Sequence, residues 1–247
     1  MAYAYGVIPS PQDRRDYTRL AVGAPVALAP SATLAVNGWL PPVRDQGAES
    51  SCTGYAIAYG RALMRYRHTG QYTEYSPHYL YWQERKREGT TNQDTGAYPR
   101  DAMKVLRKLG IATEAQMPYW RGNYEDPATD ADNANAFPYR VTRYLRCHDL
   151  SAIKTEIAMG NPVLIGLYVT ESFERTNGLI DVPSPWEQIL GGHAICPTSY
   201  TDNADYPGGG YVTFINSWGS GWSLGGYASL SYSFFQSSYF MESWSYE

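Results

Sequence analysis

Apolar residues recur with helical spacing in the first half of the chain. In the stretch "SSCTGYAIAYGRALMRYRHTGQ", apolar or aromatic side chains stand at positions 55, 56, 59, 63 and 66. Spacings of three and four place these side chains on one side of a helix. The helix is predicted to begin within two residues of Cys52 and to stop near Gly70.

Two further helices are predicted downstream. In "SPHYLYWQERKREG", Ser76 offers a capping oxygen and a proline occupies the first helical position. In "PRDAMKVLRKLG", from Pro99, Gly110 supplies the stop. The run "QERKREG" at 83–89 is interpreted as a solvated helix face.

The second half alternates like β-strands separated by glycine and asparagine. The predicted strands cover residues 139–146, 162–170, 192–201, 210–218, 226–235 and 239–246. One short helix is expected at 149–160, and "DNADYPGGG" is expected at a hairpin tip. A helical part followed by an antiparallel β part indicates the α+β class.

The composition shifts after residues 121–138, which are rich in Asp, Asn and Pro. This stretch superficially resembles a calcium loop, but Ala134 and Asn135 stand where such a loop needs an oxygen ligand and a glycine. We interpret it as a surface connection, and we expect no metal site. The predicted organisation is an extended segment at 1–39, a helical lobe at 40–135 and a β-rich lobe at 136–247.

Composition narrows the class of partner. The 247 residues are 43% hydrophobic and 18% charged, which is ordinary for a folded globular protein. A net charge of −4 leaves no basic face for a nucleic-acid backbone. The apolar stretch 20–36 is interrupted by Pro25 and Pro30 and is too short to span a membrane, so we expect an extended segment across the folded body. The site of action stays open, with a cytoplasmic or assembly-associated location favoured over secretion.

Three cysteines cannot form a disulfide framework, so a reactive thiol is possible. Only Cys52 lies at a predicted helix N-terminus, whose dipole and free N–H groups could lower a thiol pKa into the range of about 3.5 to 7.5. Cys147 is next to His148, but neighbours on an extended chain point to opposite faces. Cys147 and Cys196 are therefore expected to be small buried residues.

His193 is the strongest candidate for a general base. His68, His78 and His148 occupy positions common for surface histidines, whereas two glycines immediately before His193 would let another backbone approach the imidazole. Asn216, in "FINSWGSGW", could accept a hydrogen bond from one ring nitrogen and leave the other facing a sulfur. The Trp218 ring could cover that bond.

The blocks "QGAESSC", "GGHA" and "INSWGSGW" resemble, in order and spacing, the signatures of papain-like cysteine peptidases. His193 lies 193 − 52 = 141 residues after Cys52, and Asn216 lies 216 − 52 = 164 residues after it. The stretches "EGTTNQDTGAYPRDAMKVLRKLGI" and "YVTESFE…LGGHAI" resemble the propeptide-poor members of bacteria and their viruses. The resemblance implies a helical left lobe, a β-barrel-like right lobe and a cleft between them.

The resemblance also implies roles for individual residues. Cys52 would be the nucleophile, His193 the general acid and base, and Asn216 the residue that orients the histidine. The side-chain amide of Gln46 and the Cys52 backbone N–H would bind the oxyanion. The implied substrate-binding residues are Gly96, Ala97, Tyr98, Ala194 and Trp218.

Several positions depart from the family pattern. Glu49 stands where papain has a half-cystine, Thr53 replaces a tryptophan, Ala97 replaces the second glycine of a pair, and Ser223 replaces a glycine. None of these changes alters the reacting atoms. About 40 residues precede "LPPVRDQG", too few for a long helical propeptide, so control by zymogen cleavage is not expected.

The resulting hypothesis is a thiol endopeptidase without a cofactor, in which sulfur and imidazole from separate lobes meet across a groove as a charged pair. The alternatives are an exopeptidase whose cleft is closed at one end by residues 1–39, and an acyl or amide transferase with the same triad. A third alternative is a papain-fold binding or structural component of a larger assembly. The expected partner is a polypeptide substrate, with no nucleic acid and no membrane.

Overall fold

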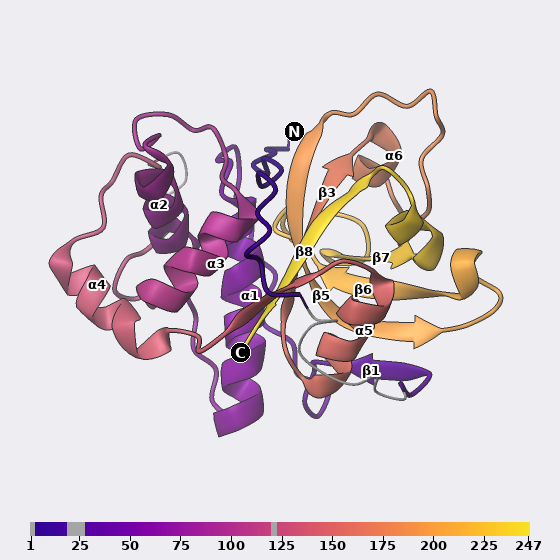
Figure 1. The fold of residues 1–247 in the computed structure, drawn as a ribbon, viewed down its shortest axis with the longest axis horizontal. Helices are drawn as coiled ribbons and strands as arrows, with labels where there is room; N and C mark the ends of the chain where they lie inside the picture. Colours follow the sequence, from indigo (N-terminus) through magenta and orange to yellow (C-terminus); the bar gives the residue numbers. More distant parts are fainter. Residues whose placement is uncertain (1–2, 19–27, 120–122) are drawn as a thin grey trace.

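The computed structural model describes residues 3–18, 28–119 and 123–247. Residues 19–27 of the predicted N-terminal segment lie outside the described residues. Helices α2, α3 and α4 gather on one side of the molecule and the β-sheet on the other, with α1 between them (Figure 1). The described N-terminal residues run along the junction of the two parts (Figure 1). The α+β class predicted from the sequence is confirmed.

The helices begin and end where local sequence favours it. Their bounds are α1 Cys52–Thr69, α2 Pro77–Glu88, α3 Pro99–Lys108, α4 Asp130–Ala136, α5 Leu150–Met159 and α6 Glu171–Glu174. Gly70 ends α1 in the left-handed conformation, which a glycine adopts without steric penalty. The Ser76 side chain accepts a hydrogen bond from the Tyr79 N–H at the start of α2. The helices predicted from Cys52, Ser76, Pro99 and residue 149 are thus confirmed.

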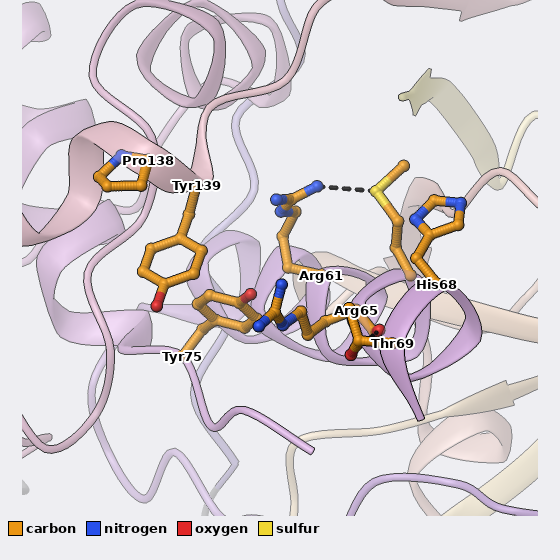
Figure 2. Close-up of a pocket in the computed structure, with 8 residues that line it drawn as sticks. Arg61, Arg65, His68, Thr69, Tyr75, Pro138 and Tyr139 are labelled. Carbon is orange, nitrogen blue, oxygen red and sulfur yellow. Dashed lines mark hydrogen bonds between the residues drawn. The ribbon is translucent and has the colours of Figure 1, made fainter. Parts of the chain in front are cut away.

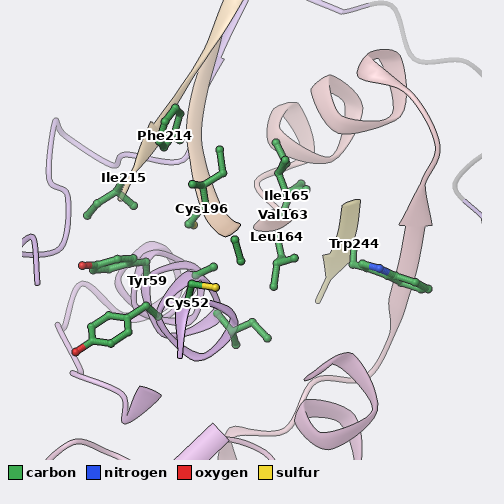
Figure 3. Packing of buried hydrophobic residues seen from close by; sticks show 14 of the residues in the cluster. Cys52, Tyr59, Val163, Leu164, Ile165, Cys196, Phe214, Ile215 and Trp244 are labelled. Carbon is green, nitrogen blue, oxygen red and sulfur yellow. The ribbon is translucent and has the colours of Figure 1, made fainter. Parts of the chain in front are cut away.

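Helix α1 is buried more completely than its apolar spacing predicts. Every residue from 52 to 60 is buried, so the expected one-sided pattern is wrong for its first half. Small residues allow the close packing: a Cβ on Gly54 would lie 2.4 Å from the Pro77 carbonyl oxygen, and one on Gly60 would lie 2.1 Å from the Tyr246 hydroxyl. In Figure 3, Cys52 and Tyr59 lie in one buried cluster with residues of β3 and β5.

The sheet consists of β1 Ser31–Thr33, β2 Tyr144–Cys147, β3 Val163–Val169, β4 Leu179–Ile180, β5 Gly191–Asp202, β6 Gly210–Ile215, β7 Tyr227–Ser231 and β8 Phe240–Tyr246. Its order is β2-β8-β3-β5-β6-β7-β4, and β1 pairs with β5. All pairings are antiparallel except β4 with β7. Opposite Leu167 of β3, His193 is held on a central strand. All six predicted strand regions contain strands; β5 is one residue longer at each end than predicted, β2 ends one residue later, and the other four strands are shorter.

Three predictions from the first half of the chain are wrong. The predicted surface connection at 121–138 contains α4, begun by a capping box between Thr129 and Asp132. The run 83–89 is not a fully solvated face, because Arg85 is buried and donates hydrogen bonds to the Thr91 and Gln93 carbonyls. His78 is buried and bonded to the Asp126 carbonyl, where a surface position was expected. At Arg85 and His78, contacts with other segments override a local polar pattern.

Two further expectations concern the cysteines and the membrane. Cys147 and Cys196 are buried, as predicted for small core residues, while His148 is exposed. Within the described residues, no helix combines the length and the apolar character needed to cross a bilayer. The boundaries placed at residues 39 and 135 stay predictions.

Candidate active site

Cys52 is the first residue of α1 and has no solvent exposure. Its sulfur lies within hydrogen-bonding reach of the backbone N–H groups of Ala194 and Gly6. Ala194 directly follows His193 on β5, so this contact places the sulfur beside the strand that carries the imidazole. Gly6 comes from the N-terminal segment and covers the sulfur from the other direction.

His193 and Asn216 form a buried hydrogen bond, with 2.7 Å between the histidine Nε2 and the amide Oδ1. Because an amide oxygen only accepts, Nε2 carries the proton and Nδ1 has a free lone pair. Nδ1 is buried and has no hydrogen-bond partner among the described residues. The arrangement has the form predicted from the sequence, with one ring nitrogen held and the other available.

Trp218 covers this bond. Its ring stacks on the His193 imidazole with centroids 4.5 Å apart and planes inclined by 29°. The Asn216 Oδ1 also accepts from the Ser217 N–H at 2.8 Å, which fixes the amide in place. The imidazole therefore has one orientation, set by a hydrogen bond at one edge and a ring on one face.

Gln46 is fully buried beside these residues. Its amide nitrogen donates to the Glu49 carbonyl at 2.7 Å, and its amide oxygen accepts from the Ser217 hydroxyl at 2.5 Å. One of the two amide N–H bonds is thereby used. The second is the one left for an oxyanion, if Gln46 has the role that the resemblance implies.

The groove beside Cys52 contains residues 3–10 of the same chain, which we call the strap. On the helical side, the Ala97 N–H donates to the Gly6 carbonyl at 2.7 Å, and the Ile8 N–H donates to the Ala97 carbonyl at 3.2 Å. These bonds form a parallel bridge between Val7 and Ala97. The strap thus pairs with the backbone that was predicted to hold substrate.

On the sheet side the strap uses side chains as well as backbone. The Val7 N–H donates to the Gly192 carbonyl at 2.9 Å. Tyr3 stacks on Trp218 with centroids 4.3 Å apart, and the Tyr5 hydroxyl donates to the Glu174 carboxylate. A cavity of about 720 Å³ stays open beside Tyr3 on this side of the groove.

Glycines on both sides of the groove leave the space that the strap backbone occupies. A Cβ on Gly96 would lie 2.2 Å from the Gly6 carbonyl oxygen, and one on Gly192 would lie 2.2 Å from the Val7 carbonyl oxygen. The prediction that the glycines before His193 admit another backbone is confirmed, with the strap as that backbone. Gly96 supplies space, whereas the neighbouring Ala97 supplies the hydrogen bonds.

The other predicted substrate-binding residues lie around the same groove. Ala194 is buried against the Cys52 sulfur. Tyr98 is half-buried at the start of α3, and its N–H donates to the Glu88 carboxylate at 2.9 Å. A role for either residue in side-chain selection stays a prediction.

The electrostatics of the closed groove differ from those expected. Burial raises the pKa of the Cys52 thiol to about 12, although the N–H groups of Ala194 and Gly6 oppose the rise. Burial also lowers the pKa of His193 to about 4, against the Asn216 hydrogen bond. The expectation of a low thiol pKa and a charged pair is wrong for this closed form, because the covered sulfur and imidazole have lost their water.

Some residues that hold the strap were not predicted from the sequence. The Ser10 N–H donates to the Glu242 carboxylate at 2.6 Å, and Asp16, beyond the strap, pairs with Arg100 at 2.6 Å. Arg146 contacts the same Asp16 carboxylate at 3.5 Å. No local motif marks these pairs, since their partners are separated by 84 to 232 residues.

Comparison with known proteins identifies the class. The description "Papain family cysteine protease" matches residues 32–245, and the chain belongs to this family. The fold is the papain-like fold, as the resemblance implied. Ser223, in place of a family glycine, has a φ of 46°, the left-handed region that favours glycine.

Individual relatives come from distant sources. An uncharacterized peptidase C1-like protein of Acanthamoeba polyphaga mimivirus is 30% identical over 207 residues, which cover 77% of this chain and 64% of that protein. Papain of Carica papaya is 26% identical over 197 residues, covering 77% of this chain and 51% of papain. The chain thus spans about half to two thirds of these relatives. Xylellain, a cysteine protease from Xylella fastidiosa, superposes with a TM-score of 0.84 at 27% identity, covering 99% of this chain and 96% of xylellain.

Proposed function

We propose that this protein is a latent cysteine peptidase that hydrolyses peptide bonds through Cys52, His193 and Asn216. The Cys52 thiolate attacks the carbonyl carbon, a carbon–sulfur bond forms, and the tetrahedral oxyanion is held by the Gln46 amide and the Cys52 N–H. The carbon–nitrogen bond then breaks as His193 gives its proton to the departing amine. Water, deprotonated by His193, hydrolyses the thioester and restores the thiol.

The observation that carries this proposal is the His193–Asn216 bond beneath Trp218. It leaves the imidazole Nδ1 of His193 without a hydrogen-bond partner among the described residues. The next residue of β5, Ala194, has its N–H within reach of the Cys52 sulfur. A buried imidazole held this firmly, beside a buried thiol, suits proton transfer better than it suits packing. With water and substrate readmitted, the helix N-terminus and the imidazole favour the thiolate–imidazolium pair.

In this proposal the strap lies in the groove in a position that does not lead to its own cleavage. The strap group that faces the sulfur is the Gly6 N–H, which is a donor and not an electrophile. The Gly6 carbonyl oxygen is already bonded to the Ala97 N–H. Attack needs a carbonyl carbon over the sulfur with its oxygen toward Gln46, so the strap occupies the groove without entering the reaction.

The path of the strap supports endopeptidase action. Tyr3 and Tyr5 contact Trp218, while Val7 and Ile8 pair with Gly192 and Ala97, so an extended chain passes on both sides of the Gly6 position beside the sulfur. An exopeptidase would need one end of the groove closed. Once the strap leaves, a polypeptide can lie through the groove and be cut internally.

The filled groove also favours a second candidate, a papain-fold binding component in which the thiol has no turnover. Cys52 has no exposed surface while the strap is in place. If strap release is not part of the protein's function, the Cys52 site would have no catalytic role, and the protein would act as a binding component of a larger assembly. The two candidates differ in whether Cys52 reacts after the strap is displaced.

The test is peptide-library cleavage by the full chain and by a variant lacking residues 1–10, with Cys52→Ala as the control in each. We expect internal cuts in peptides blocked at both ends by the shortened variant, and none from Cys52→Ala. A bell-shaped pH profile should accompany cleavage, from formation and loss of the thiolate–imidazolium pair. Cleavage that survives Cys52→Ala, or a folded shortened variant that neither cleaves nor reacts with a thiol-reactive epoxide, would reject the peptidase. Ligated product in excess of hydrolysis with an added amine would indicate a transferase.

A further inference from the structure

A second cavity, of about 360 Å³, lies beside the later turns of α1 and outside the groove. Its walls are the side of α1 that carries Arg61, Arg65 and His68, together with Tyr75 and the Pro138–Tyr139 step (Figure 2). Arg61 is nine residues beyond Cys52, about 13 Å along the helix axis. The cavity is therefore separate from the sulfur but built on the same helix.

The cavity concentrates positive charge. Arg61, Arg65 and His68 stand at positions i, i+4 and i+7 of α1, which places all three on one face. Like charges four residues apart destabilise a helix unless something between them compensates. In Figure 2 the two guanidinium groups project from α1 toward the same space.

Nothing in the described part of the chain neutralises these arginines. Among the described residues neither has a carboxylate within ion-pair distance, and Arg61 donates to the Met64 sulfur at 2.7 Å, a weak acceptor. The Nε atoms of both Arg61 and Arg65 are buried without a hydrogen-bond partner. Arg44, by contrast, pairs with Glu74 and Glu114 a short distance away.

The remaining walls supply a donor and apolar surface. The Tyr75 hydroxyl is buried beside the Thr73 side chain and donates to no acceptor among the described residues, and its ring lies 5.9 Å from the Arg61 guanidinium carbon. Tyr139 packs against Tyr75 edge to face. Burial lowers the pKa of Arg61, and the neighbouring Arg65 charge lowers it further, as expected for cations that lack a counter-ion.

We propose that this cavity binds an oxyanion of the phosphate class. Guanidinium groups bind phosphate through parallel N–H···O bonds, and the unused Nε–H groups and the Tyr75 O–H are donors with no acceptor of their own. His68 stands exposed at the rim. The anion is either free phosphate or a phosphate group on a larger molecule, since both offer the same oxygens.

The test is calorimetric titration of the full chain with inorganic phosphate and, separately, with a phosphoserine dipeptide, each at constant ionic strength set with chloride. We expect saturable binding of phosphate and no response to chloride alone. Arg61→Gln combined with Arg65→Gln should reduce affinity at least about tenfold, as expected for loss of charge-assisted bonds. Tighter binding of the dipeptide than of phosphate would assign the site to phosphorylated macromolecules. Equal affinity for both ligands would show that the site recognises the phosphate group alone.

The matched control is Arg107→Gln combined with Lys108→Gln, which removes the same charge from exposed positions of α3. It should leave phosphate affinity unchanged. Tyr75→Phe, which removes only the hydroxyl, should weaken binding a few-fold in a protein that still folds. No saturable binding by the full chain, or equal loss in the control and the Arg61/Arg65 variant, would overturn the proposal, leaving the arginines as cations that favour the end of the helix. Because the readout is binding, it does not depend on peptidase activity.

Discussion

The two walls of the groove hold the strap in different ways. The wall at Ala97 and Arg100 contributes main-chain groups: the Ala97 N–H and carbonyl pair with the strap backbone, and the Arg100 N–H donates to the Ser10 hydroxyl. The opposite wall adds the ring of Trp218 and the carboxylates of Glu174 and Glu242. Main-chain pairing accepts any extended chain, whereas side-chain contacts select one sequence.

The two walls therefore have different tasks: the first holds an extended chain of any sequence, and the second selects the sequence of the strap. The first wall is available to strap and substrate alike at Ala97, because the two Ala97 bonds do not depend on side chains. The second wall, together with the Asp16 anchor, favours the strap. Changes that weaken the second wall should therefore activate the enzyme without damaging substrate binding at the first.

Removing the strap should have the largest effect. With a Cys52 pKa of about 12, about one thiol in 10⁵ is ionised at pH 7, and each unit of decrease raises the thiolate tenfold. If uncovering restores an activated thiol, deletion of residues 1–10 should accelerate Cys52 alkylation by about 10⁴-fold. Mass spectrometry of alkylated peptides measures this site by site.

In that experiment Cys147 and Cys196 serve as internal controls, since both are buried away from the strap. The alkylation rate of the closed form should rise about tenfold with each pH unit between pH 5 and 9, because the thiol pKa lies above this window and the reacting thiolate increases tenfold per unit. The His193 pKa, at about 4, lies below the window and should add no further inflection. Fast alkylation of the intact chain at pH 7 would contradict the closed geometry.

The next largest effect is expected at the anchor. Asp16 is almost fully buried between Arg100 and Arg146, and breaking a buried ion pair by removing one partner costs about 3 to 5 kcal/mol. Asp16→Ala should shift the strap toward release and raise the Cys52 alkylation rate by roughly 10²-fold or more, up to the strap-free rate. The matched control is Asp13→Ala, because Asp13 pairs with Arg15 of the same segment. An equal increase in the Cys52 alkylation rate in both variants would show that the Asp16 ion pairs have no special role in holding the strap.

A pH-dependent stability effect is expected at the buried Glu49, three residues before Cys52. Burial, with the nearby Asp94 carboxylate, raises the pKa of Glu49 to about 7, so the folded state retains a proton that the unfolded chain loses near pH 4.5. Stability from this group is present below pH 4.5 and is lost as pH rises through 7, by about 3 kcal/mol.

Glu49→Gln removes that titration. The variant should match the native chain near pH 4 and exceed its free energy of unfolding at pH 8 by up to about 3 kcal/mol, measured by urea denaturation. Glu125→Gln, at an exposed position, is the control and should leave the pH profile unaltered. A variant less stable than the native chain at pH 8 would show that the charged carboxylate contributes favourable bonds.

The smallest effect is expected at Tyr5. Tyr5→Phe keeps the ring beside Trp218 and removes the hydrogen bond to Glu174. A partly buried hydrogen bond contributes about 1 kcal/mol, so strap release and Cys52 alkylation should increase about fivefold. Tyr17→Phe, at an exposed position outside the strap, should change neither rate. Alkylation unchanged by Tyr5→Phe would place strap selection on the aromatic contacts alone.

Much of the site could be predicted because its signals are local. The glycine pair before His193, the polar Asn216 after an apolar strand and the helix start at Cys52 are each visible in a few residues. Backbone propensity and capping act over the same short range. The His193–Asn216 bond joins residues only 23 apart, across two neighbouring strands.

The errors have the opposite character. Arg85 and His78 lie in polar stretches of the sequence yet are buried, because hydrogen-bond partners from residues 91–93 and from Asp126 replace water. The α4 helix was missed although Thr129 and Asp132 form a capping box, since the surrounding Asp and Asn residues favour turns. The predicted low Cys52 pKa and charged pair with His193 are wrong for the closed form because burial outweighs the helix dipole.

By itself the sequence determined the α+β class, the main helices and strands, the family and the identity of the candidate triad. These follow from periodicity, caps and short motifs, whose physics is local. Only the tertiary structure decided that residues 3–10 lie in the groove, that Asp16 joins Arg100 and Arg146, and that Arg61 and Arg65 face a cavity without a counter-ion. Such outcomes depend on which distant segments share a desolvated space, and desolvation is a property of the packed molecule, not of any stretch of chain.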